Sequence, residues 1–290
     1  YRLMVGTRTV QHSHLDYDSK GAIIGMNLEG LEYPFTWQYD PTSGFLNYLT
    51  YPNGMARCNT YHPRLNLGTA IGYRKGADGE LAAGHEYDYD ALGRPIQRRD
   101  SWDVATPAAL RDFTYNGRSE LVEDRISRGR SFIYSYDNIG NRKTVRELEE
   151  EVSYDANDRP IVFTSQDGRT AITCGYDYQG RRYMKKVTVN GTVASHERYL
   201  YRGYLQLAAL DMLDNRNVRR TLLWDPLEPV AARPLALVQG ASLYCYGWDF
   251  NKNVTEVFDG QGTIAAAYDY SPYGIVGSTG NLVQPVQWSS

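Results

Sequence analysis

Tyr89-Asp90-Ala91-Leu92-Gly93-Arg94-Pro95-Ile96 and Tyr136-Asp137-Asn138-Ile139-Gly140-Asn141-Arg142 are two copies of one pattern, and this pattern decides the fold. Aspartate and asparagine accept hydrogen bonds from backbone amides two residues further on, and glycine adopts the positive φ that many tight turns require. Residues 132–136, just before the second turn, form an aromatic and alternating run that is typical of a strand. Each copy therefore predicts a strand, a turn and a returning strand.

The Tyr-Asp pair recurs along the chain, with His or Asn in place of Asp in two copies. Successive tyrosines of the series lie 18 to 28 residues apart. A period of about 20 residues is too short for a pair of helices and fits two short strands and two turns. The copies are Tyr17-Asp18, Tyr39-Asp40, Tyr61-His62, Tyr89-Asp90, Tyr115-Asn116, Tyr136-Asp137, Tyr154-Asp155 and Tyr176-Asp177.

Two later copies keep this turn chemistry with small changes. Tyr176-Asp177-Tyr178-Gln179-Gly180-Arg181 retains a glycine, Gly180, whereas Tyr154-Asp155-Ala156-Asn157-Asp158-Arg159 carries Asn157 where we expect left-handed backbone. We expect each Asp to cap its turn. We also expect each Tyr to pack on one face of a strand and to bond its hydroxyl to a neighbouring strand.

The composition supports an all-β fold. The chain has 25 Tyr but only 7 Phe, together with 27 Gly, which is typical of many short strands joined by polar turns. No amphipathic helix of convincing length is predicted, and the most helix-like patch, residues 146–151, is expected to be a solvated strand edge or a turn. The sequence therefore predicts a repetitive β-hairpin strip.

One hairpin can be aligned residue by residue. Asn190-Gly191 is a two-residue loop of the kind that most strongly predicts a hairpin. Closing the hairpin there predicts the pairs Val189–Thr192, Thr188–Val193 and Val187–Ala194.

The chain reads as one continuous domain in two parts, repeats over 1–200 and a related segment over 201–290. Pro226, Pro229 and Pro234 indicate an irregular loop, because proline cannot serve a central strand. Strand, turn and strand return over residues 243–258, and the tail from residue 277 to 290 is rich in turn residues.

Charge and cysteine usage exclude several classes of function. The formal net charge of −3, with both signs interleaved, gives no basic surface for nucleic acid. No apolar run approaches the roughly 18 residues of a membrane-spanning helix. Cys58, Cys174 and Cys245 are far apart and predict free, buried thiols, with neither a disulfide framework nor a zinc site.

No catalytic, metal or cofactor site is predicted. His12 and His14 would share one face of a strand, and Asp16 could join them, but two ligands without a spaced third are a weak metal signal. His62, His85 and His196 are expected in turns or on the surface. An Asp that recurs in every copy indicates a turn cap, because an active site is a single constellation, and no nucleophile elbow or other catalytic motif occurs.

The Tyr-Asp-x-x-Gly-Arg units resemble the YD repeats of bacterial Rhs and wall-associated proteins, of toxin-complex C components and of teneurins. The C-terminal part, from Leu222-Leu223-Trp224-Asp225-Pro226 onward, resembles the start of the Rhs repeat-associated core. The residues that carry this second resemblance most strongly are Tyr268, Asp269, Tyr270, Pro272, Tyr273 and Gly274.

The resemblance implies a non-catalytic scaffold, a spiralling β-shell that encloses a variable C-terminal toxin in polymorphic-toxin systems. The expected partners are the rest of the shell and a C-terminal effector, with no nucleic acid, and the expected location is secreted or at the cell surface. The family's aspartyl self-cleavage motif is expected beyond Ser290. The alternative is a carbohydrate-binding adhesion module that binds cell-surface glycans, in which a line of tyrosines would face solvent and stack on sugars.

Overall fold

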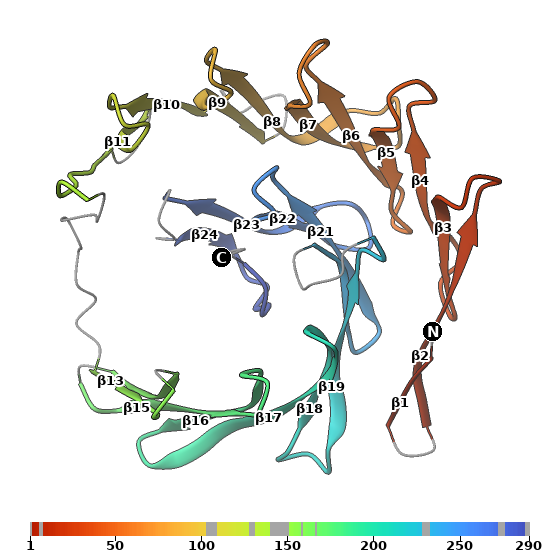
Figure 1. The fold of residues 1–290 in the computed structure, drawn as a ribbon. Helices are drawn as coiled ribbons and strands as arrows, with labels where there is room; N and C mark the ends of the chain where they lie inside the picture. The colour runs from red at the N-terminus through yellow and green to blue at the C-terminus, as the bar shows by residue number, and fades with distance from the viewer. Residues whose placement is uncertain are drawn as a thin grey trace. The chain divides into compact units, whose positions relative to one another are not determined.

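The structure is a computed structural model that describes residues 2–5, 8–102, 109–127, 131–139, 151–157, 159–165, 167–227, 233–271 and 276–287. Within these ranges every regular element is a β-strand, which confirms the predicted all-β fold (Figure 1). None of these residues forms a helix that could cross a membrane.

The first sheet contains twelve strands that follow one another in chain order, and the neighbours from β2 to β12 pair antiparallel. Its strands are β1 (Arg2–Val5), β2 (Arg8–Tyr17), β3 (Ile23–Leu28), β4 (Phe35–Tyr39), β5 (Leu46–Thr50), β6 (Met55–Tyr61), β7 (Gly68–Lys75), β8 (Leu81–Tyr89), β9 (Pro95–Trp102), β10 (Ala109–Tyr115), β11 (Leu121–Ile126) and β12 (Phe132–Ile133).

The second sheet also has twelve strands in chain order. Its strands are β13 (Glu151–Tyr154), β14 (Pro160–Thr164), β15 (Thr170–Tyr176), β16 (Arg182–Val189), β17 (Thr192–Arg202), β18 (Leu205–Asp211), β19 (Asn217–Trp224), β20 (Pro234–Gln239), β21 (Ser242–Trp248), β22 (Val254–Phe258), β23 (Ile264–Tyr270) and β24 (Val276–Gly280). Most of residues 146–151 lie outside the described residues.

The chain divides into two compact units. The first comprises Tyr1–Arg2, Gln11–Val145 and Tyr244–Ser290, and the second comprises Leu3–Val10 and Arg146–Leu243. This division reflects contacts and does not test the boundary expected at residue 200, which stays a prediction.

A β-bulge accompanies the repeated aromatic residue. The register shifts between that residue and the one before it in each of these pairs: Asp16/Tyr17, Gln38/Tyr39, Thr60/Tyr61, Asp88/Tyr89, Thr114/Tyr115, Ser153/Tyr154, Gly175/Tyr176, Leu200/Tyr201, Leu223/Trp224, Gly247/Trp248 and Val257/Phe258. A bulge re-aims a side chain and increases the local twist, and here it falls at the repeated aromatic residue.

A bulge also corrects the predicted hairpin. Val189 pairs with Thr192 and Thr188 with Val193, as predicted, and Asn190 and Gly191 both have positive φ. Val187 then pairs with Ser195 instead of Ala194, because the register shifts between Val187 and Thr188.

Two further expectations are corrected. Pro234 is the first residue of β20, a position where the missing amide costs no central hydrogen bond, whereas Pro229 lies outside the described residues. Residues 276–280 of the tail form β24, which pairs with β23 from Tyr270 to Ala266.

In the first unit, β21–β23 pack on one face of the strip formed by β5–β11, called here the wall (Figure 1). The Tyr51 hydroxyl donates to the carbonyl of Tyr246, and the Tyr73 hydroxyl donates to that of Trp248. Side chains that are fully buried in this unit include Trp37, Tyr51, Tyr73, Tyr246, Phe35 and Phe258. The two layers therefore share one core.

Candidate functional site

The aspartate of the described repeats caps the turn that follows it. Asp90 Oδ1 accepts hydrogen bonds from the amides of Leu92 and Arg94 at 2.9 and 3.0 Å. The same arrangement, with one or two amides, occurs at Asp18, Asp40, Asn116, Asp137, Asp155 and Asp177. At His62 the ring Nδ1 accepts from the amides of Arg64 and Leu65, so histidine replaces aspartate as the cap.

After Asp18, Asp90, Asn116 and Asp177, the residue three positions after the cap takes the left-handed conformation, whereas after Asp40 it is the residue four positions on, Gly44. Gly93 and Gly180 have φ of 76° and 77°, and Ser119 has a φ of 65° at the same place in its turn. Asn157 is not among the residues with positive φ, so the expectation for it is wrong. Counting from the cap, the equivalent position is Asp158, which lies outside the described residues.

The repeated tyrosines form a ladder of side-chain hydrogen bonds. Tyr89 pairs across its bulge with Pro95, and the hydroxyl of the next repeat's tyrosine, Tyr115, donates to the Pro95 carbonyl at 2.9 Å. The same relation joins Tyr39 to Ile23, Tyr61 to Leu46, Tyr89 to Gly68, Tyr136 to Leu121, Tyr176 to Pro160, Tyr201 to Arg182 and Tyr270 to Val254. Each tyrosine therefore joins its own repeat to the preceding one.

The arginine of the pattern makes the connection in the other direction. Arg159 Nε donates to Asp155 Oδ2 at 2.8 Å, and its guanidinium carbon lies 5.2 Å from the ring centroid of Tyr176. Its Nη1 donates to the carbonyl of Asp177, in the next turn. Arg94 and Arg181 repeat this arrangement over Tyr115 and Tyr201.

Several predicted residues differ from this scheme or lie outside it. Tyr17 and Tyr154 are more than half exposed. Asp269 lies within β23 and not in a turn, and Tyr268 stacks on Tyr270 with ring centroids 6.4 Å apart. Gly140, Arg142, Pro272, Tyr273 and Gly274 lie outside the described residues.

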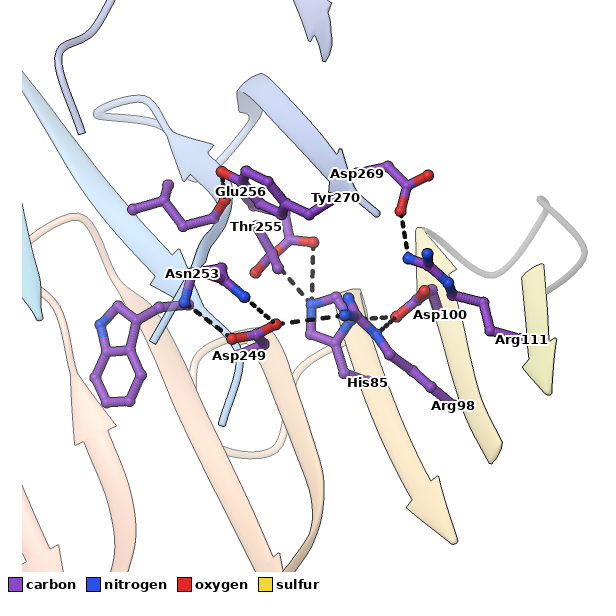
Figure 2. A network of polar contacts seen from close by, with 12 residues as sticks. His85, Arg98, Asp100, Arg111, Asp249, Asn253, Thr255, Glu256, Asp269 and Tyr270 are labelled. Carbon is purple, nitrogen blue, oxygen red and sulfur yellow. Dashed lines mark hydrogen bonds and ion pairs between the residues drawn. The ribbon is translucent and has the colours of Figure 1, made fainter. Parts of the chain in front are cut away.

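A buried polar cluster lies between the wall and the C-terminal strands of the first unit (Figure 2). It consists of His85 on β8, Arg98 and Asp100 on β9, Asp249 in the β21–β22 turn, and Glu256 on β22. Cross-strand pairing places His85 opposite Asp100. His85, Asp249 and Glu256 are fully buried.

His85 lies between two carboxylates. Its Nδ1 is 2.6 Å from Asp100 Oδ1, and its Nε2 is 3.2 Å from Glu256 Oε1. Arg98 donates through Nε to Asp100 at 2.6 Å and through Nη1 to Asp249 at 3.3 Å. Contacts from β8 and β9 therefore reach residues more than 150 positions away in sequence.

The remaining oxygens of the two distant carboxylates are also bonded. Glu256 accepts from Trp102 Nε1 at 3.1 Å and from Thr255 Oγ1 at 2.7 Å. Asp249 Oδ1 accepts from the amide of Asn253 at 2.9 Å. Such complete bonding is what allows charged groups to be buried at all.

A second ion-pair group lies beside the cluster. Arg111 donates to Asp124 within the wall at 2.6 Å and to Asp269 on β23 at 2.8 Å. Three ion pairs therefore join the wall to the C-terminal strands: Arg98–Asp249, His85–Glu256 and Arg111–Asp269.

The surroundings shift the ionisation of this cluster strongly. Burial alone lowers the pKa of His85, but the Glu256 charge and the hydrogen bonds with Asp100 and Glu256 outweigh it and raise the pKa to about 9. Burial alone raises the pKa of Asp100, but the Arg98 charge and the contacts with His85 outweigh it, so that this pKa is well below its usual range. The two carboxylates therefore favour the imidazolium form of His85.

The placement of His85 corrects the sequence-based expectation of a turn or surface residue. Its partners are 15 and 171 positions away, so no local spacing announces them. The available signal is a set of charged residues at core-facing positions of otherwise apolar strands, such as Glu256 within Val254–Phe258. Such residues, when buried, need partners of opposite charge.

The proposed histidine pair does not assemble a metal site. His12 Nδ1 lies 3.5 Å from Glu29, and His14 Nε2 lies 3.5 Å from Asp16. No group of three potential ligands gathers anywhere in the described ranges. Cys174 and Cys245 are free and buried as predicted, whereas Cys58 is only half-buried.

The contacts of the repeats define a class of protein: an all-β strip in which side chains bond each repeat to its neighbours. No protein-family model matches the chain. It is 26% identical over 200 residues to the tRNA3(Ser)-specific nuclease WapA of Bacillus spizizenii, a match that covers 55% of this chain and 8% of that protein.

Three solved toxin-complex structures have a similar fold. The TcdB2–TccC3–Cdc42 crystal structure aligns with a TM-score of 0.68 and 14% identity over 91% of this chain and 17% of that chain. TcdB2–TccC3 without its hypervariable C-terminal region gives 0.65 and 13% over 96% and 18%. The Photorhabdus luminescens Tc holotoxin pore gives 0.62 and 14% over 92% and 17%. At these identities the likeness shows the fold, and the chain spans less than a fifth of each.

Proposed function

We propose that this chain is a wall segment of a toxin-associated β-shell, a non-catalytic scaffold that encloses or presents an effector in the same protein. The observation that carries the proposal is the ladder: the Tyr, Asp and Arg of the pattern are used to join repeats. Tyr115, for example, bonds the preceding repeat, and Arg159 bonds the following one. The fold shared with TccC3-containing structures over 91% of the chain supports the same role.

The buried cluster supports a structural role. A catalytic group must reach its substrate, yet His85 and Glu256 have no exposed surface. Their charges join two layers of one unit.

The direct test uses the complete natural protein that carries this chain. We expect the other domains of that protein to resist a broad-specificity protease until the denaturant reaches the concentration at which this chain unfolds. The variant Gly68→Ala, in which an added Cβ would collide with Phe250, should lower that concentration, whereas Gly260→Ala, with open space around its Cβ, should not. Digestion at the same rate whether or not the wall is folded would contradict an enclosing role.

Two assays address the other classes of function. Hydrolysis of tRNA by the purified chain that is lost on a single Asp or Glu substitution would overturn the non-catalytic assignment. A glycan array tests the adhesion alternative. We expect no specific binding, because the hydroxyls of the repeated tyrosines are bonded to backbone carbonyls.

A further inference from the structure

His85 can donate to both of its carboxylate neighbours only when both ring nitrogens carry a proton. Each ring nitrogen of His85 faces a carboxylate oxygen, Asp100 on one side and Glu256 on the other. A neutral imidazole donates from one nitrogen and carries a lone pair on the other. Loss of the proton would therefore direct a lone pair at a carboxylate in a fully buried site.

The charges of the cluster make this loss more costly. With His85 protonated, two positive groups, His85 and Arg98, face three carboxylates, those of Asp100, Asp249 and Glu256. Without the proton, one cation faces three anions away from water. Arg98 lies on the other side of the ring, with Nη2 3.3 Å from His85 Nδ1, and makes no contact with Glu256 that would replace the lost donor.

The contact that depends on this proton joins two layers. His85 belongs to the wall, and Glu256 belongs to the C-terminal strands that cover it. We propose that the His85 cluster is a proton-dependent clasp, which holds β21–β23 on the wall while the imidazole is charged and releases them when its proton is lost.

The expected direction follows from the shift of the His85 pKa. Because the folded value, about 9, lies above the ordinary value of 6.5, the clasp is fully formed below about pH 6.5 and weakens as the pH rises towards 9. Burial raises the pKa of Tyr73 and of the Cys245 thiol to about 12, so neither group titrates in this window.

Cys245 provides a direct measure of release. Its thiol, on β21, is fully buried and lies against the backbone of Asn53 in the wall. The rate at which iodoacetamide alkylates Cys245 in the folded chain would be measured by peptide mass spectrometry. It would then be divided by the rate in the urea-unfolded chain at the same pH. This ratio removes the effect of thiolate formation. Cys174, buried in the second unit, is an internal control in the same sample.

The protection of Cys245 is the factor by which folding slows its alkylation. We expect this factor to fall on the order of a hundredfold between pH 7 and 10, because each unit of pKa shift corresponds to a factor of ten. In His85→Gln, which stays neutral at every pH, protection should be lower at pH 7 and should not fall further. Cys174 should be unaffected in both proteins. A flat profile for the wild type, or an equal fall in His85→Gln, would overturn the clasp.

A second measurement does not depend on any variant. The ring carbon resonance of His85 should titrate near pH 9 in the wild-type chain. A midpoint below pH 7 would also overturn the proposal. Failure of the clasp would leave the scaffold proposal standing, because the repeat ladder does not involve His85.

Discussion

The repeated tyrosine makes two contacts, of which phenylalanine could make only one. Its ring packs beside the arginine of the previous repeat, as Tyr176 does under Arg159, and its hydroxyl bonds a backbone carbonyl of that repeat. The carbonyl belongs to the residue paired with the previous tyrosine across the bulge, as Pro160 is with Tyr154. This second contact explains why the repeated position carries Tyr in a chain with 25 Tyr and only 7 Phe.

Removal of one hydroxyl should show its value. Tyr89→Phe keeps the ring but leaves the Gly68 carbonyl without its 2.7 Å hydrogen bond. We expect a loss of about 1 kcal/mol in the free energy of unfolding, measured by urea denaturation. Tyr178→Phe is the matched control, because Tyr178 is 91% exposed. Equal stabilities for the two variants would contradict the ladder.

The arginine offers a second test at the same scale. Arg159→Lys keeps the charge but removes the planar group that lies over Tyr176 and the fork that reaches Asp177. We expect a loss of about 0.5 to 1 kcal/mol. Arg169→Lys, at an exposed turn position in the same unit, should be neutral. A double-mutant cycle with Tyr176→Leu should give a coupling energy, whose absence would count against the stacking.

At the level of elements, the sequence predicts strands and turns but not the bulges. The Asp cap and the glycine at Gly93 are local chemistry, so the turn can be predicted from the residues alone. A register shift depends on which face each neighbouring strand must bury. For that reason the hairpin at Asn190-Gly191 matches its prediction for two pairs and departs from it at Val187.

The packing of β7 against the C-terminal strands sets a strict limit on one residue. A Cβ on Gly68 would overlap the ring of Phe250, which also packs 5.3 Å from the Tyr87 ring. We expect Gly68→Ala to cost about 1 to 3 kcal/mol by overpacking. The second change Phe250→Leu should restore part of that loss, as thermal denaturation would show. Gly260→Ala is the control, and a full loss that persists with Phe250→Leu would contradict this contact.

At the level of the whole molecule, the pairing of distant segments could not be foreseen. The sequence gives no sign that residues 244–290 form a compact unit with residues 11–145. His85 illustrates the reason. Its surroundings are made by β9 and β22, and nothing near it in sequence distinguishes it from the exposed His14.

Two compact units imply two sites of unfolding. Because contacts in repeat proteins are made mainly with neighbours, stability is approximately a sum of local terms, and a single cooperative transition is not required. Phe258→Ala, at a fully buried position of the first unit, should lower one calorimetric transition, with a loss of about 3 to 5 kcal/mol.

Leu222→Ala, equally buried in the second unit, should lower the other transition by about 2 to 5 kcal/mol and leave the first in place. If both variants shift one common transition by comparable amounts, the chain unfolds as a single cooperative body. The chain would then derive its stability from long-range packing. The ladder between neighbouring repeats would fix the geometry of the repeats but would not determine the temperature at which they unfold.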